Sequence, residues 1–244
     1  MNVVVLGAAS AIAEQVARLH AARGAALLLV GRKAARLAAV AADLRVRGAA
    51  RAEVRALDLD DLSAHAALAV EAEALLGPVD LVLVAQGALG DPATYAADPA
   101  AAAAVLHTNL VAPASLLTAF AARMAPRGAG SLVVIGSVAG DRGRGSNFAY
   151  GAAKGGLALF AQGLRARWQR AGLHVLTVKP GFVDTPMTEH VPRNPLFATP
   201  ERVAAVIVRA GDARRDVVYV PWFWRWIMLA VRAIPERVFK KLEL

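Results

Sequence analysis

The feature that most constrains the fold is an alternation that runs along the whole chain. Short apolar runs, often β-branched, are separated by helix-length segments rich in Ala, Leu, Arg and Glu. Continuous apolar strands that alternate with helices are typical of a parallel sheet covered on both faces. We therefore expect an α/β fold with a single Rossmann-type, doubly wound, parallel seven-stranded sheet and helices on both faces. The expected strands are 3–6, 26–30, 53–57, 80–85, 131–136, 174–179 and 216–220.

The domain organisation follows from length and continuity. A chain of 244 residues fits one large domain, and no repeat or linker interrupts it. The stretch Gly90-Asp91-Pro92 reads as a surface loop. We expect a catalytic domain at 1–221 and an apolar tail at 222–244.

Composition narrows the classes of function. The chain has no cysteine, which excludes a disulfide framework, a thiolate metal site and a cysteine nucleophile, and fits a reducing compartment. The first residues read as a strand and not as a signal peptide. The net charge is +9, but no nucleic-acid-binding module is present, so no nucleic-acid partner is expected. The spread arginines predict a solvated basic surface, or alternatively attraction to an anionic membrane or substrate: Arg18, Arg23, Arg32, Arg36, Arg45 and Arg47.

Ligands of doubly wound sheets bind beyond the carboxyl ends of the strands. After the first expected strand, a loop of small residues leads into a helix, where backbone amides can approach a pyrophosphate. Its candidate binding residues are Gly7, Ser10, Ala11 and Ile12. Because Gly7 is the only glycine in this loop, the segment equally fits an ordinary strand–helix turn.

The second expected strand ends in two cations, Arg32 and Lys33. An arginine at this place suits the 2′-phosphate of NADP, since guanidinium matches phosphate bidentately. The alternative is a solvated helix start. Further on, Asp58 and Leu59 are placed to hold the adenine, and Gln86 and Gly87 form a small turn beside the adenosine. The expected cofactor is NADP(H).

Four polar residues carry the candidate chemistry. Tyr150 and Lys154 lie one turn apart on one face of a helical stretch, where a neighbouring ammonium lowers the pKa of a phenol. Ser137 ends a strand, so its hydroxyl can bind a substrate carbonyl. Asn109 lies upstream and by itself equally fits a helix kink or cap.

In order and spacing, these motifs resemble the short-chain dehydrogenase/reductase family of the classical type, over nearly the whole chain. The chain departs from the family's GxxxGxG loop, since Ala11 and Ala13 stand where the second and third glycines belong. The resemblance implies that Tyr150 is the general acid/base, that Ser137 polarises the carbonyl and that Lys154 also binds the nicotinamide ribose. It implies that Asn109 holds a proton-relaying water and that 183–196 is a mobile lid. It further implies cofactor contacts at Pro180, Gly181, Val183 and Thr185.

The expected function is an NADP(H)-dependent oxidoreductase that interconverts a ketone and a secondary alcohol, with Tyr150 passing a proton to the carbonyl oxygen. A catalytically silent NADP(H)-binding regulator is the alternative from another class. No metal is expected, because the five histidines lack a ligand pattern: His20, His65, His107, His174 and His190.

Two segments bear on the substrate, a small-molecule or lipid-linked carbonyl compound. Arg142 and Arg144, expected near the site mouth, are either solvated loop charges or contacts to an anionic substrate. The tail combines tryptophans with Arg225 and Arg232, which suits a helix in a membrane interface, an oligomer contact or packing on its own domain. These features are similar to reductases of decaprenylphosphoryl-2-keto-pentose, which implies a keto sugar on a polyprenyl phosphate. Reduction of another hydrophobic ketone (3-oxoacyl, steroid-like or retinoid-like) is the alternative. We expect a cytoplasmic homo-oligomer that is peripheral on the cytoplasmic face of the membrane.

Overall fold

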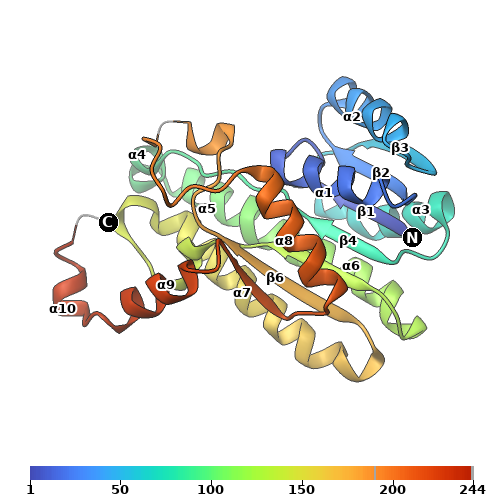
Figure 1. Ribbon diagram of the computed structural model, residues 1–244. Coiled ribbons are helices and arrows are strands. Elements are labelled where there is room, and N and C mark those ends of the chain that lie inside the picture. Colours follow the sequence, from blue (N-terminus) through green and yellow to red (C-terminus); the bar gives the residue numbers. More distant parts are fainter. Residues whose placement is uncertain (190, 243–244) are drawn as a thin grey trace.

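The fold is a seven-stranded parallel sheet with the strand order β3-β2-β1-β4-β5-β6-β7, as expected for a doubly wound protein (Figure 1). The computed structural model describes residues 1–189 and 191–242, so His190 and the last two residues of the expected tail lie outside the described residues. The strands are β1 (Asn2–Leu6), β2 (Ala26–Gly31), β3 (Arg51–Ala56), β4 (Leu81–Val84), β5 (Ser131–Ile135), β6 (His174–Pro180) and β7 (Val217–Val220).

The burial of each strand follows its position in the sheet. All four residues of the central strand β4 are buried, because helices cover both of its faces. The edge strand β3 is mostly exposed or half-buried. This strand begins at Arg51 and not at residue 53, since its first residues pair in register with β2 although one of them is charged.

Two layers of helices cover the sheet (Figure 1). One face packs against α1 (Ala11–Ala21), α2 (Ala34–Val46) and α8 (Pro200–Asp212), and the other against α3 (His65–Leu76), α6 (Ala112–Met124) and α7 (Phe148–Trp168). Each layer closes its own apolar core against the sheet. The right-handed crossovers of such folds bring all carboxyl strand ends to one edge.

The connection after β4 contains more helix than expected. The loop around Gly90 is followed at once by α4 (Pro92–Ala97), whose first amides donate to the Asp91 carboxylate, and then by α5 (Pro99–Leu106). Between α5 and α6, residues His107–Val111 form a π-helical turn. The continuous helical segment Pro99–Arg127 is long and apolar enough to span a membrane by length and composition. Its α6 part, however, buries Leu117 and Phe120 in the core of the domain.

The tail packs back onto the domain along one face. It forms α9 (Trp224–Ala233) and α10 (Glu236–Phe239), which lie at the end of the molecule away from the N-terminus (Figure 1). Trp224, Met228 and Phe239 are buried, whereas Trp222 and Trp226 remain 69% and 58% exposed. The tail is therefore docked through one face and leaves an apolar face to solvent.

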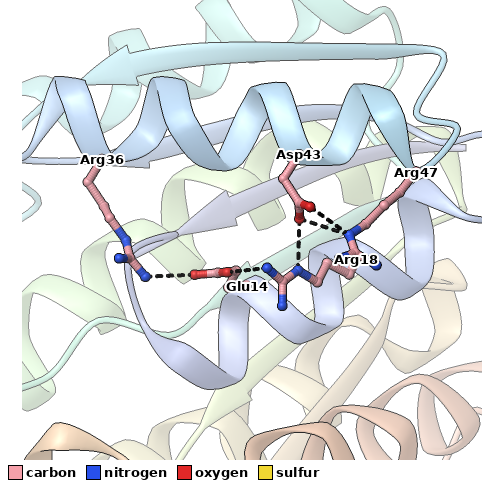
Figure 2. Close-up of polar contacts among 5 residues, drawn as sticks. All are labelled: Glu14, Arg18, Arg36, Asp43 and Arg47. Atoms are coloured by element: carbon pink, nitrogen blue, oxygen red, sulfur yellow. Dashed lines mark hydrogen bonds and ion pairs between the residues drawn. The ribbon is translucent and has the colours of Figure 1, made fainter.

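Most of the arginines expected at the basic surface are bound to acceptors. Figure 2 shows the network that joins α1 to α2: Glu14 pairs with Arg18 and Arg36, and Asp43 pairs with Arg18 and Arg47. Outside this network, Arg23 pairs with Asp212, and Arg45 donates to the Ala52 carbonyl. Because Arg23, Arg36 and Arg47 remain about half exposed in these pairs, the solvated basic surface stays a prediction.

Candidate active site

A cavity of about 490 Å³ opens at the carboxyl edge of the sheet. It is lined by residues that follow β1, β2, β3, β4, β5 and β6, together with one face of α7 and part of the segment after β6. Every residue assigned to the site from sequence lines it except Asn109. The set comprises Gly7, Ser10, Ala11, Ile12, Arg32, Asp58, Leu59, Gln86, Gly87, Ser137, Tyr150, Lys154, Pro180, Gly181, Val183 and Thr185.

Tyr150 and Lys154 lie on the cavity face of α7, and both are almost entirely buried. The Lys154 ammonium donates a 3.0 Å hydrogen bond to the Ile135 carbonyl at the end of β5, and its Nζ lies 5.7 Å from the centre of the Tyr150 ring. Burial lowers the pKa of Lys154 to about 8, because the charged form loses hydration.

The electrostatics of Tyr150 differ from the sequence-based expectation. Burial raises the pKa of Tyr150 to about 12, and a hydrogen bond with Ser137 opposes that shift. Lys154 was expected to lower this pKa. Its ammonium is instead buried with the phenol and bound to a main-chain carbonyl, so desolvation outweighs its attraction for a phenolate. Tyr150 is therefore a protonated acid across the neutral range.

Ser137 is placed by the end of β5. It precedes the turn Val138–Asp141, a 3-10 turn, and its Oγ accepts a 3.0 Å hydrogen bond from the Ala139 amide. This bond fixes the hydroxyl orientation, so its proton is free for a second acceptor. With Tyr150 as hydrogen-bond partner, the two hydroxyls converge on one point of the cavity, where a carbonyl oxygen can bind both.

Asn109 lies behind the cavity and not in its wall. It is fully buried in the π-helical turn, where its amide donates to the carbonyls of Ala88 and Val105 and its Oδ1 accepts from the Ala88 amide. Asn109 thus lies in a π-helical turn of a continuous helical segment, and its side chain also holds the loop after β4. Gly87 separates it from Lys154: a Cβ there would lie 2.8 Å from Asn109 Oδ1 and 3.3 Å from Lys154 Nζ. The water-relay role of Asn109 stays a prediction.

The loop after β1 has the geometry of a phosphate-binding turn. Gly7 has a φ of +82°, and a Cβ at this position would lie 2.6 Å from the Gln86 amide, so only glycine fits. Helix α1 begins at Ala11, and its first amides point to the cavity end of the helix, where anions bind. Of the two alanines that replace glycines, Ala11 lines the cavity, whereas Ala13 is fully buried in the core.

The second strand presents the cations to the cavity. Arg32 and Lys33 are exposed and line it. Within residues 1–189 and 191–242, Arg32 has no hydrogen-bond or carboxylate partner, in contrast to the paired arginines of α1 and α2. An unpaired guanidinium at a cavity wall suits a phosphate. Together with the Gly7 loop and the α1 N-terminus, the residues present fit a phosphorylated dinucleotide.

Sequence reasoning missed one polar group of the wall. Asp60 and Thr108 line the cavity beside Gln86. The Thr108 hydroxyl donates a 2.6 Å hydrogen bond to the Asp60 carboxylate, and the Asp60 carbonyl is hydrogen-bonded to the His107 ring. These contacts tie the segment after β3 to the π-helical turn. No sequence signal pointed to them, because they join residues 47 and 48 positions apart.

The two arginines expected at the site mouth have different surroundings. Arg142 is bound to the tail: it donates to the carbonyls of Val231, Arg232 and Ile234 and pairs with Glu236. Neither a solvated nor a substrate-binding role fits it. Arg144 does not line the cavity; its Nε is buried without a partner in the described part of the chain, and burial lowers its pKa.

The described histidines serve the fold. His65 binds Ser115 and the Leu59 carbonyl, His107 binds the Asp60 carbonyl, and His174 bridges Ser131 and the Arg215 carbonyl. His20 belongs to α1 and is buried against residues of the sheet and of α8. Among the described residues no group of three or more potential metal ligands occurs.

Comparison with known proteins agrees with this geometry. The family model described as short chain dehydrogenase matches residues 1–195. The chain belongs to the short-chain dehydrogenase family. It is 44% identical to an uncharacterised oxidoreductase of Mycobacterium tuberculosis over 98% of this chain and 96% of that protein. It is 34% identical to cis-4-hydroxycyclohexanecarboxylate dehydrogenase of Sinomonas cyclohexanicum, over 88% and 91% of the two chains.

Among solved structures, a short-chain dehydrogenase from Sphingobium yanoikuyae in complex with NADPH superposes with a TM-score of 0.83. It shares 25% identity and covers 97% of both chains. The protein is thus a short-chain oxidoreductase that uses a nicotinamide cofactor and acts on a CH–OH or C=O group. The likeness to decaprenylphosphoryl-2-keto-pentose reductases stays a prediction.

Proposed function

We propose that this protein is an NADPH-dependent reductase that interconverts a ketone and a secondary alcohol. The observation that carries the proposal is a single cavity that combines Ser137, Tyr150 and Lys154 with the unpaired Arg32. The first three residues supply a proton-transfer site, and the fourth supplies a site for an extra phosphate.

Each side chain has a distinct task. The nicotinamide cofactor supplies or accepts the hydride when it is bound. The hydroxyls of Ser137 and Tyr150 hold the carbonyl oxygen, and Tyr150 donates its proton to that oxygen, which carries the developing negative charge. Lys154 stands beside the Tyr150 ring, held by Ile135, and its ammonium stabilises the phenolate that this proton transfer leaves.

The preference for NADPH over NADH rests on Arg32 and Lys33. Guanidinium binds a phosphate through two parallel hydrogen bonds, whereas an enzyme selective for NAD places a carboxylate there for the ribose 2′-hydroxyl. The NADPH complex of the Sphingobium protein supports the same preference.

The test is to replace Tyr150 by Phe and measure NADPH affinity and ketone reduction over a ketone panel. We expect NADPH affinity to be kept and turnover to fall by about 10²- to 10⁴-fold. Tyr95→Phe is the matched control, because Tyr95 is buried outside the cavity and its hydroxyl has no partner in the described chain. Near-normal turnover in Tyr150→Phe would refute the assignment.

A silent NADP(H)-binding regulator is the competing function. It would bind NADPH tightly and turn over no ketone, including lipid-linked keto sugars. The replacement of a family glycine by Ala11 is its one structural support, since this methyl lies in the cavity wall.

We further propose that the outer face of α9 rests on an anionic membrane surface at the cytoplasmic side and gives access to a hydrophobic carbonyl substrate. Trp222, Trp226 and Leu229 are exposed along one stripe, with Arg225 and Arg232 beside them. Aromatic and basic side chains on one helix face suit the boundary between headgroups and acyl chains. A keto sugar on a membrane-bound polyprenyl phosphate would reach the cavity from the membrane surface under α9. Another hydrophobic ketone is the alternative substrate.

Liposome flotation tests the membrane contact. Wild-type protein should float with phosphatidylserine vesicles, and a Trp226→Ser/Leu229→Ser variant should not. Flotation with uncharged phosphatidylcholine vesicles measures the apolar contribution alone, so the difference from phosphatidylserine vesicles gives the contribution of charge. If both proteins float equally with the anionic vesicles, or neither floats, the proposal is contradicted.

A second copy of the chain is the proposed protein partner. Leu159 and Phe160 of α7 and Val111 of the π-helical turn are exposed apolar side chains outside the tail, as expected of a subunit contact. A Leu159→Glu variant should reduce the mass measured by analytical ultracentrifugation to that of one chain. A wild-type protein that is already monomeric would refute this.

A further inference from the structure

The inner face of α9 reaches the wall of the active site. Trp224 is only 6% exposed and packs in an apolar cluster with Val138, the residue after Ser137, and with Phe182, the residue after Gly181. Its ring lies so close to Gly181 that a Cβ there would stand 1.9 Å from the indole Nε1. One tail side chain therefore contacts the neighbours of two cavity residues.

Arg142 makes a second connection between the same turn and the tail. Its guanidinium donates to three carbonyls at the end of α9, at 2.6 to 3.2 Å from the nitrogen, and pairs with Glu236 at 2.8 Å. It also lies over the Phe239 ring of α10, 4.0 Å from the ring centre. The last carbonyls of a helix lack their usual intrahelical amide partners; here the Val231 carbonyl also accepts from the Ile234 amide, and the guanidinium donates to all three carbonyls. A positive charge at this position is also stabilised by the negative end of the helix dipole.

The turn Val138–Asp141 is held from its other sides as well. The buried Asp141 carboxylate binds the Lys179 ammonium of β6 and the Tyr219 hydroxyl of β7. Gly140 packs on the α7 backbone, where a Cβ would lie 2.5 Å from the Gly155 amide. The turn thus lies between the tail and the helix that carries Tyr150 and Lys154.

We propose that the tail is a positioning element of the active site, in which Trp224 and Arg142 press the turn Val138–Asp141 against α7 and thereby hold Ser137 within hydrogen-bond reach of Tyr150. The proposal rests on the proposed reductase function. Neither residue touches the reacting atoms; both act through Ser137. Because proton donation requires the two hydroxyls to meet at one oxygen, a displacement of Ser137 by about 1 Å is enough to lower turnover up to 10²-fold.

The first experiment compares four variants of the full-length protein: Arg142→Gln and Trp224→Leu against the controls Arg237→Gln and Trp168→Leu. The controls replace the same residue types away from the turn Val138–Asp141, since Arg237 is exposed on α10 and Trp168 lies half-buried at the last position of α7. With a ketone that wild type reduces, we expect Arg142→Gln and Trp224→Leu to lower kcat by about ten- to a hundredfold. The Kd of NADPH, measured by tryptophan fluorescence quenching, should change little for Arg142→Gln. Both controls should behave like wild type.

If Arg142 and Trp224 only stabilised the fold, their replacement would lower Tm without a specific loss of kcat. A second measurement separates such a structural role from the positioning role. In a Ser137→Ala background, adding Arg142→Gln should lower kcat by less than twofold, since the group through which Arg142 acts is already gone. Arg142→Lys, which keeps the charge, should recover part of the lost kcat. Independent losses that multiply in the double variant, or a wild-type kcat in Arg142→Gln, would overturn the proposal. A wild-type protein that reduces no ketone would instead refute the reductase function.

Discussion

Gly181 lies directly against the indole ring of Trp224, with no room for even one methyl group between them. Its backbone lines the cavity on one side and contacts the tail on the other. The contact explains why glycine follows Pro180 here although its φ lies outside the left-handed region.

We expect Gly181→Ala to lower kcat/KM at least tenfold, because the new Cβ must displace the ring or the cavity wall. Trp224→Leu in the same chain should relieve that clash and recover part of the activity lost to Gly181→Ala. Steady-state kinetics of the two single variants and the double variant form the test. Strictly additive losses would contradict a direct contact.

Arg32→Ala should weaken NADPH binding about ten- to a hundredfold and leave NADH binding nearly unchanged. The reason is that hydrogen bonds to a charged phosphate are worth about 1.5–3 kcal/mol. Arg36→Ala is the control, because Arg36 pairs with Glu14 on the α1–α2 network (Figure 2). Equal losses for both cofactors would show that Arg32 does not bind the 2′-phosphate.

The pH dependence of the two reaction directions should differ. Tyr150, with a pKa of about 12, keeps its proton in the neutral range, and Lys154 loses its proton near pH 8. If the reaction uses the ammonium, kcat/KM for ketone reduction is flat below pH about 8 and falls about tenfold per unit above it. For alcohol oxidation, which needs the phenolate, kcat/KM rises up to about pH 8 and then levels off. A reduction rate that holds to pH 10 would contradict this assignment.

His20 should make the fold acid-sensitive. Burial, with a smaller contribution from Arg23, lowers its pKa from 6.5 to about 4. Below pH 6.5 His20 binds a proton in the unfolded chain but stays neutral in the folded chain. The stability contributed by neutral His20 is therefore complete above pH 6.5 and is lost as pH falls toward 4. Between pH 7.5 and 5 the loss is about 2 kcal/mol.

Urea unfolding of wild type and His20→Leu at these two pH values tests this prediction. The variant should lose about 2 kcal/mol less than wild type on acidification. Because His65 and His174 are present in both proteins, their contributions cancel in the comparison. The same acid sensitivity in both proteins would show that His20 is not responsible.

The sequence predicted the sheet because buried parallel strands must be continuously apolar, as β1 and β4 are. It predicted the cavity residues for a related reason: parallel strands end at one edge, so Gly7, Arg32 and Ser137 meet although they are far apart in the chain. It did not predict the setting of Arg142, whose tail partners lie 89 to 94 positions further on. No local pattern encodes such a contact.

The Tyr150–Lys154 pair shows which properties follow from the sequence and which depend on the tertiary structure. By itself, the sequence determined that the two side chains share one helix face, since their spacing equals one turn, and that a serine precedes them at a strand end. Only the tertiary structure decided how they ionise. Burial raises the pKa of Tyr150 and lowers that of Lys154, because both lose hydration under neighbours supplied by β5, the turn Val138–Asp141 and the rest of the fold. Desolvation depends on what surrounds a group in space, which the spacing of two residues along a helix does not determine.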